Sequence, residues 1–217
     1  TVLSRGLGDV YKRQGHVVLD APLRTQHAEV EELVRQHARW LRFRVDRIRE
    51  ETAHLGRAGF KPGELVLYLG DPLRLEHGDG ARVTLDKGVL RVPAGDESDT
   101  RRLIRNWYSE RADYIFAEVF GGYRHLPWLN GQLPVWQHSY MKSQWGSCSS
   151  KGVISLNTHL VRTPRHLIEY VVLHEICHLR HHDHSRRFDA LMSMHMPQWP
   201  DRSQELRQNM SLLLDER

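Results

Sequence analysis

The stretch His174-Glu-Ile-Cys-His-Leu-Arg-His-His-Asp-His184 decides the fold. His174 and His178 are four residues apart, so on a helix their imidazoles lie on one face and can share a metal ion. Glu175 lies beside them as a candidate general base for a metal-activated water. The chain has 15 histidines in 217 residues. At that frequency a random His-Glu-x-x-His occurs in roughly one such chain in fifteen, and far more rarely with a histidine at the tenth position. The pattern therefore predicts a catalytic metal site with three protein ligands.

The third ligand has to come from the histidines that follow this helix. A helix rises about 1.5 Å per residue, so His181 lies too far along the axis to close a site between the first two ligands. The chain has to turn back, and Asp183 is a suitable place for the helix to stop before Ser185 caps a new one. We expect His184 to be the third ligand. The alternatives are His181, His182 and His195.

The residues before and within the motif predict a buried helix. Thr163 is a suitable N-cap and Pro164 a suitable first helical residue. Cys177 is expected to pack as a small apolar residue. Ionisable side chains on such a helix need partners, and a metal ion supplies one. Apolar residues occur nearly all round the helix: Leu167, Ile168, Val171, Val172, Leu173, Ile176 and Leu179.

The composition is that of an ordinary globular protein, with 40% hydrophobic and 27% charged residues. No run approaches the roughly 18 apolar residues of a membrane span, and no secretory signal opens the chain, so we expect a cytoplasmic protein without membrane contact. The net charge is +4, but basic residues are interspersed with acidic ones. Nucleic-acid contact is therefore permitted and not demanded. The two cysteines lack Cys-x-x-Cys spacing, which excludes a thiolate zinc motif.

The N-terminal half is expected to contain two parts. Residues 1–14 are expected to be non-native and unpacked, because Asp9-Val-Tyr-Lys-Arg-Gln14 resembles a translated transposon-end adapter. Residues 15–95 are expected to hold a strand at His16–Asp20, a long amphipathic helix that begins after Thr25, and a small antiparallel meander. The meander strands are predicted at Leu65–Leu69, Leu73–Glu76, Arg82–Leu85 and Val89–Val92.

Residues 96–217 are expected to form the domain that holds the metal. A helix is predicted to start around Asp96–Ser98 and to stop at Gly121-Gly122. Strands are predicted at Pro134–Ser143 and Gly152–Asn157, and a closing helix begins at Pro200. We interpret Gly152–Asn157 as a sheet edge that pairs with an extended substrate, with an ordinary core strand as an equal alternative.

Three segments resemble one known family: Met141-Lys-Ser-Gln-Trp-Gly-Ser-Cys-Ser-Ser150, Ile154-Ser-Leu-Asn157 and His174–Phe188. From about residue 16 to its end the chain resembles the YgjP-like metallopeptidases, bacterial proteins related to the SprT and WLM zinc proteases. The resemblance implies Zn²⁺ bound by the two helix histidines and by the histidine of an Asn/Asp-His-Ser-x-x-Phe motif. In this chain that motif is Asp183-His-Ser-Arg-Arg-Phe188, which supports His184. The family usually has a basic residue before Trp-Gly-Ser-Cys, and this chain has Gln144 there.

We therefore expect an α+β protein. A small N-terminal antiparallel β region with a long helix precedes a zincin-like metallopeptidase core of strands, the His-Glu-x-x-His helix and C-terminal helices. The expected function is zinc-dependent hydrolysis of a peptide or protein, with Glu175 as general base. One alternative is a nucleoside triphosphate pyrophosphatase, a label that some family members carry. Another is a DNA-associated protease of the SprT kind, and a third is a structural zinc module without catalysis.

Further site residues are less determined by the sequence. Cys148 has no evident base beside it and is not expected to be a nucleophile. The candidates for substrate binding are Trp145, Gly146, Ser147 and Asn157. The candidates for stabilising a developing oxyanion are Tyr140, Tyr170, His138, His159 and Arg162, which spacing alone does not rank.

Overall fold

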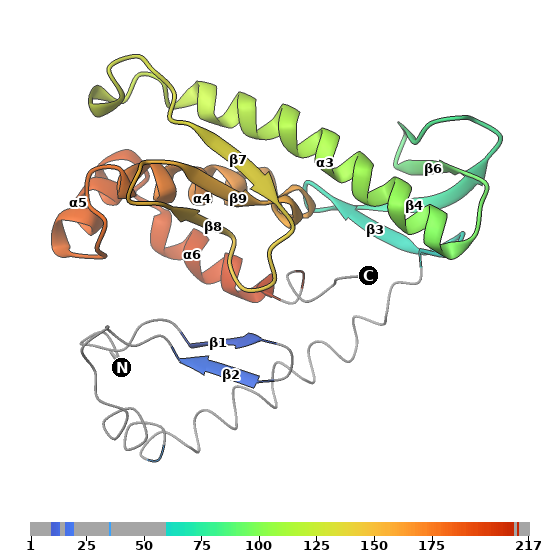
Figure 1. The fold of residues 1–217 in the computed structure, drawn as a ribbon, viewed down its shortest axis with the longest axis horizontal. Helices are drawn as coiled ribbons and strands as arrows, with labels where there is room; N and C mark the ends of the chain where they lie inside the picture. The colour runs from blue at the N-terminus through green and yellow to red at the C-terminus, as the bar shows by residue number, and fades with distance from the viewer. Residues whose placement is uncertain (1–9, 14–15, 20–34, 36–59, 211, 213–217) are drawn as a thin grey trace. The chain divides into compact units, whose positions relative to one another are not determined.

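The computed structural model describes residues 10–13, 16–19, 35, 60–210 and 212 (Figure 1). The chain divides into two compact units, Thr1–Gly56 and Arg57–Arg217. In the first unit β1 (Val10–Arg13) pairs antiparallel with β2 (His16–Leu19). The strand predicted at residues 16–20 is therefore present, and residues 10–13, which we expected to be unpacked, form its partner. The long helix predicted after Thr25 lies outside the described residues.

A four-stranded sheet opens the second unit, with the strand order β3-β4-β6-β5. Each strand lies where the sequence predicted one, but the prediction of an antiparallel meander was wrong, because β4 and β6 pair in parallel. Leu90 and Val92 of β6 are completely buried, whereas all three residues of β5 are exposed. The apolar strand therefore takes the inner position and the polar strand takes the edge. The bounds are β3 (Leu65–Tyr68), β4 (Asp71–Gly78), β5 (Thr84–Asp86) and β6 (Val89–Pro93).

Helix α3 (Glu97–Gly122) begins and ends where the sequence predicted. Asp96 is its N-cap, and Oδ1 of Asp96 accepts a hydrogen bond of 2.8 Å from the backbone N–H of Asp99. The helix packs on the four-stranded sheet, since the Tyr108 hydroxyl donates to the carbonyl of Leu67 at 2.6 Å. The domain boundary predicted between residues 95 and 96 thus falls inside one compact unit. The buried residues of α3 are Thr100, Ile104, Trp107, Tyr108, Ala112, Ile115, Phe116, Val119 and Phe120.

A second, three-stranded sheet has the order β7-β9-β8, and its strand β7 runs beside α3 (Figure 1). The interpretation of Gly152–Asn157 as an edge was wrong, because β9 (Ile154–Asn157) lies in the middle. Its position follows from its side chains, since Ile154, Leu156 and Asn157 are completely buried. The outer strand next to the helix that carries His174 and His178 is β8 (Gly146–Cys148). The other outer strand is β7 (Trp136–Ser139), and the short helix η1 (Pro127–Leu129) precedes it.

Helix α4 (Arg165–His178), which carries His174 and His178, follows η2 (Thr158–Arg162) and starts one residue later than predicted. Thr163 was predicted as N-cap, but its hydroxyl donates to the carbonyl of Leu160 at 2.8 Å, and Pro164 is the cap residue. The β3–β4 turn packs on this start. A Cβ at Gly70 would lie 2.8 Å from Cγ of Pro164, and the left-handed φ of +89° at Gly70 also requires glycine. The turn therefore holds the start of α4 in place.

Two further helices follow as predicted, α5 (Arg186–His195) after the N-cap Ser185 and α6 (Trp199–Gln208). Cys177 is completely buried, as expected. Within the described part of the chain, no helix has the length and apolar character needed to cross a membrane. The buried residues of α4 are Leu167, Ile168, Tyr170, Val171, Val172, Leu173, Glu175, Ile176, Cys177 and His178.

Candidate metal centre

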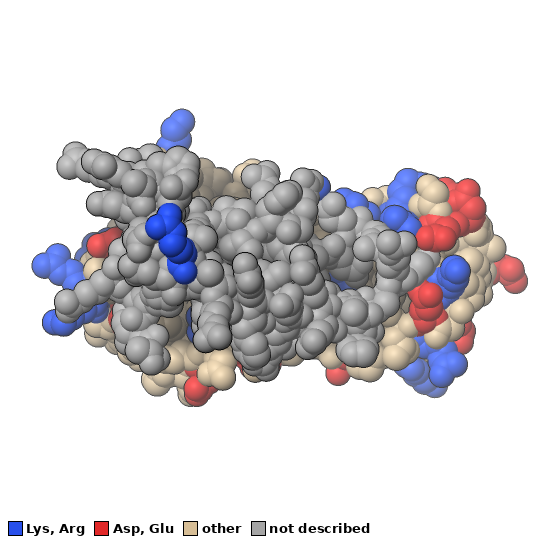
Figure 2. Space-filling view, turned by 90° about the horizontal axis from the view of Figure 1, so that it is seen from below, with Lys and Arg blue, Asp and Glu red and all other residues tan. Residues whose placement is uncertain are grey.

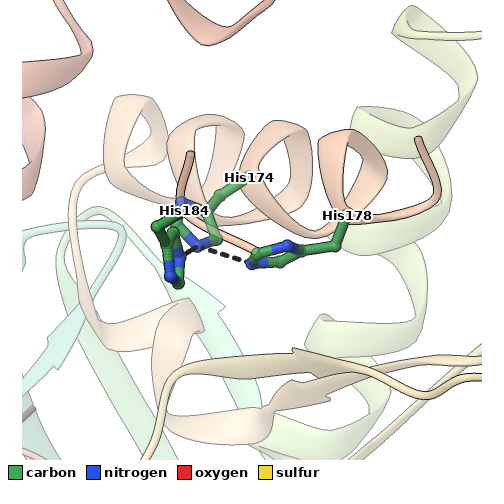
Figure 3. Close-up of side chains that lie close together, drawn as sticks. All are labelled: His174, His178 and His184. Atoms are coloured by element: carbon green, nitrogen blue, oxygen red, sulfur yellow. Dashed lines mark hydrogen bonds between the residues drawn. The ribbon is translucent and has the colours of Figure 1, made fainter. Parts of the chain in front are cut away.

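Three histidines meet at the C-terminal end of α4 (Figure 3). His174 and His178 project from the same face of α4, and His184 reaches them from the segment that leads into α5. Nε2 of His174 lies 3.2 Å from Nε2 of His178 and 3.0 Å from Nε2 of His184. The sequence had selected these three residues, and the structure brings them together.

The chemistry of the three donors fits a metal ion. Burial lowers the pKa of His174 to about 3, with smaller contributions from His178 and His184. Burial also lowers the pKa of His178. Both rings are therefore neutral near pH 7 and offer nitrogen lone pairs. Two nitrogens bound to one tetrahedral zinc are about 3.3 Å apart, close to the observed separations. A cation among the three nitrogens would also remove the repulsion between their lone pairs.

The ring of His178 is oriented by its other nitrogen. Nδ1 of His178 lies 3.0 Å from the carbonyl oxygen of His181, and an N–H donated there leaves Nε2 as the atom with the lone pair. His181, one of the alternative third ligands, thus contributes its main chain. His195 lies elsewhere, with its ring 5.3 Å from the ring of Trp128. Among the described residues, the cluster that could hold a metal ion therefore includes none of the three alternative ligands, His181, His182 and His195.

Phe188 of α5 forms an apolar support under all three imidazoles. Its ring is stacked on His178 at 4.6 Å and 29°, and lies 4.9 Å from the rings of both His174 and His184. Only 1% of Phe188 is exposed. The sequence identified Phe188 as an apolar residue of the next helix and as part of a motif, but not as this support. The motif Asp183-His-Ser-Arg-Arg-Phe188 was the available signal.

Glu175 lies on α4 next to the first ligand and is 5% exposed. Among the described residues its Oε2 has no hydrogen-bond partner. Burial raises the pKa of Glu175 to about 8. A buried carboxyl without a partner costs free energy, and such groups concentrate at functional sites, where a proton is exchanged or a ligand completes the environment. Glu175 is therefore a candidate for exchanging a proton at this site.

The substrate-binding candidates of β8 lie on different sides of their sheet. Gly146 is on the side of α4, because a Cβ at this position would lie 2.8 Å from Oε1 of Glu175. Successive residues of a strand point to opposite faces, so Ser147 points to the far side. There it lies opposite Ser155 of β9. Trp145 is 7% exposed and packs in the core.

Asn157 is completely buried, and its amide is used inside the protein. Nδ2 donates to the carbonyls of Met141 at 2.6 Å and of Gln144 at 2.8 Å. Oδ1 accepts from the N–H of His159 at 3.0 Å. Asn157 therefore shapes the segment that leads into β8, and in this arrangement its side chain is closed to a substrate.

Of the candidates for oxyanion stabilisation, Tyr170 lies beside a ligand, with its ring 5.8 Å from that of His174. Two other candidates contact α3. The Tyr140 hydroxyl donates a hydrogen bond to the carbonyl of Arg105 at 2.9 Å, and Nε2 of His138 lies 3.0 Å from Oδ1 of Asp113. His159 and Arg162 are buried in η2. Three of the five candidates lie together, since the rings of Tyr140 and His159 are 4.9 Å apart and Nη1 of Arg162 is 3.5 Å from Nδ1 of His159.

Cys148 has the environment of an unreactive thiol. Burial raises its pKa, and the nearby Glu175 raises it further. The thiol is therefore protonated near neutral pH, which agrees with the expectation that Cys148 is not a nucleophile.

Comparison with known proteins connects this centre to one family. The searches of curated proteins and of solved structures gave no match. Residues 10–209 match the YgjP-like metallopeptidase domain, which covers all the elements from β1 to α6. The chain therefore belongs to the YgjP-like metallopeptidase family.

Proposed function

We propose that this protein is a zinc-dependent peptidase with a zincin-like core, in which His174, His178 and His184 hold the metal and Glu175 is the general base. The observation that carries the proposal is the convergence of three Nε2 atoms, with Nε2 of His174 at 3.2 and 3.0 Å from the others, beside a buried carboxyl. Three ligands leave one position of a tetrahedral zinc open, as catalysis requires. Bound zinc supplies Lewis-acid chemistry, which polarises a carbonyl and makes water more acidic.

Glu175 is suited to move a proton in both directions. A carboxyl with a pKa near 8 has a much greater proton affinity than a solvated carboxyl. As a carboxylate it accepts the proton of the attacking water, and as a carboxylic acid it donates that proton to the leaving amine. Oε2 is the oxygen available for this exchange, because within the described residues it has no hydrogen-bond partner.

The edge strand β8 is the proposed binding surface for an extended peptide. Among the described strands β8 pairs with β9 alone. The N–H of Asn157 donates to the carbonyl of Trp145, and the N–H of Ser149 donates to the carbonyl of Val153. Because an antiparallel ladder alternates residue by residue, the backbone groups of Gly146 and Cys148 face away from β9. They are available to a substrate strand, next to Glu175.

The alternatives find less support in the described structure. At the end that carries β4 and β6, basic and acidic side chains are mixed (Figure 2), and Arg91 lies 3.5 Å from Glu76 and 3.8 Å from Asp86. A DNA-binding surface requires basic residues gathered on one face, which this end does not show. A nucleotide pyrophosphatase requires a phosphate-binding cradle, and the sequence contains no P-loop motif.

The test compares the wild-type chain with Glu175→Gln on unfolded protein and peptide substrates and on nucleoside triphosphates, with zinc present. We expect peptide cleavage by the wild type, and at least about a 100-fold loss of kcat in Glu175→Gln with unchanged zinc content. Glu169→Gln is the matched control, since Glu169 is on the same helix and is ion-paired with Arg165 on its surface. Undiminished cleavage by Glu175→Gln, or hydrolysis of the triphosphates alone, would contradict the proposal.

A further inference from the structure

The geometry points to Gly146 as the residue that positions the Glu175 side chain. The packing of Gly146 against Glu175 is a feature of the structure by itself, whereas its effect on catalysis rests on the proposed function. Gly146 is the first residue of β8, and α4 packs directly against this strand. Because Gly146 has no side chain, the carboxyl of Glu175 occupies the space that a side chain at residue 146 would fill.

Three atoms of Glu175 define that space. A Cβ added to Gly146 would lie 2.8 Å from Oε1, 3.0 Å from Cγ and 3.1 Å from Cδ of Glu175. Carbon atoms in ordinary contact are about 3.5–4.0 Å apart. Because Cγ is among the overlapping atoms, a rotation of the carboxyl group alone does not relieve the overlap. The whole Glu175 side chain, or the β8 backbone, has to move.

Backbone conformation is not the reason for glycine at this position. The described glycines with a positive φ do not include Gly146, and residue 146 is part of a regular strand. Glycine loses more conformational freedom on folding than any other residue, so its presence at the start of β8 needs another cause. The contact with Glu175 is that cause. Any larger residue at position 146 therefore shifts Glu175 and the β8 backbone relative to each other.

A matched control glycine is available in β4. Gly78 is also a strand residue without a positive φ, and a Cβ there would meet only Cβ and Cδ of Arg91, each at 3.8 Å. That separation is an ordinary contact. Gly78→Ala thus tests the same substitution without an overlap.

The experiment is a double-mutant cycle on the full chain, with thermal unfolding measured with and without zinc. Gly146→Ala should lower Tm by about 2–12 °C, since it overpacks a filled site. In the Glu175→Ala background the added methyl group has room, so Gly146→Ala should leave Tm unchanged or raise it slightly. Gly78→Ala should have the same small effect in both backgrounds. If Gly146→Ala does not fold, folding of the double variant Gly146→Ala with Glu175→Ala supports the inference. Failure of the single and the double variant to fold overturns it.

A second readout separates positioning from general damage. Gly146→Ala should keep one zinc per chain and lower kcat at least tenfold, with KM changed by less than about threefold. Equal Tm losses in both backgrounds, or a full kcat in Gly146→Ala, would overturn the inference. If instead the wild type has no peptidase activity, the proposed function fails, and the Tm cycle still decides the packing role of Gly146.

Discussion

Substitution of Phe188 by leucine tests whether the metal centre depends on the aromatic support beneath it. Phe188 touches the rings of all three proposed ligands, at 4.6, 4.9 and 4.9 Å. Leucine preserves most of the apolar volume and removes the flat ring. The change therefore leaves the core filled, while the imidazoles lose the surface that fixes their orientation.

The size of the effect follows from these contacts. An aromatic ring pair contributes about 0.5–1.5 kcal/mol beyond its buried area, so three pairs contribute about 1.5–4.5 kcal/mol. Leucine replaces part of that contribution, so we expect the free energy of unfolding of the metal-free chain to fall by about 1–3 kcal/mol. Loss of a group that orients metal ligands typically lowers metal affinity about 10- to 100-fold. We expect a loss in that range for zinc.

Two measurements are needed to test this prediction. Urea unfolding of the metal-free chain gives the stability change, and competition with a chromophoric chelator gives the zinc affinity. Phe120→Leu is the matched control, because Phe120 is equally buried and is stacked on Trp136 at 5.3 Å, away from the histidines. It should lower stability and leave zinc affinity unchanged. Equal zinc affinities for Phe188→Leu and the wild type would refute the reasoning, since Phe188 would then act only as a core residue.

Three further predictions concern the ligands, the β8 segment and the metal. In a competition titration, His184→Ala should lower zinc affinity by more than the roughly 100-fold expected of an orienting group, whereas His182→Ala should not change it. Tight binding of one zinc per chain by His184→Ala would exclude His184 as a ligand. Asn157→Ala removes the amide donors to the carbonyls of Met141 and Gln144, so urea unfolding should show a free energy of unfolding lower by about 2–4 kcal/mol. A loss below about 1 kcal/mol would contradict the structural role of this amide. Removal of zinc from the wild type with a chelator should lower Tm, and added zinc should raise it, because free zinc at 100 times Kd stabilises the folded chain by about 2.7 kcal/mol. A Tm that does not depend on zinc would show that the folded chain does not bind it.

The sequence predicted which three histidines lie together because the geometry of this cluster is local. A spacing of four residues on a helix places His174 and His178 on one face whatever surrounds them. Helix α4 ends at His178, five residues before the stop predicted at Asp183, so His181 lies beyond the helix, and the segment that follows returns His184 to the other two histidines. The starts of α3 and α5 were also predictable, because Asp96 and Ser185 are residue types that favour the N-cap position.

The parts that the sequence did not predict depend on contacts between distant segments. The parallel pairing of β4 with β6 results from competition between two strands for one inner position, which neither strand shows alone. The edge position of β8 and the middle position of β9 are set in the same way. The contact between Gly146 and Glu175 joins residues 29 positions apart, and no periodic pattern marks it. Sequence reasoning therefore found Glu175 but assigned no positioning role to Gly146.

The central claim is a three-histidine zinc centre with one open position. Zinc analysis of the purified wild-type chain, combined with X-ray absorption at the zinc edge, tests it most directly. We expect one zinc per chain, with three imidazole nitrogens at about 2.0–2.1 Å and one water-derived oxygen as ligands. A fourth ligand from the protein would indicate a closed structural site, and a chain that takes up no zinc would contradict the account altogether.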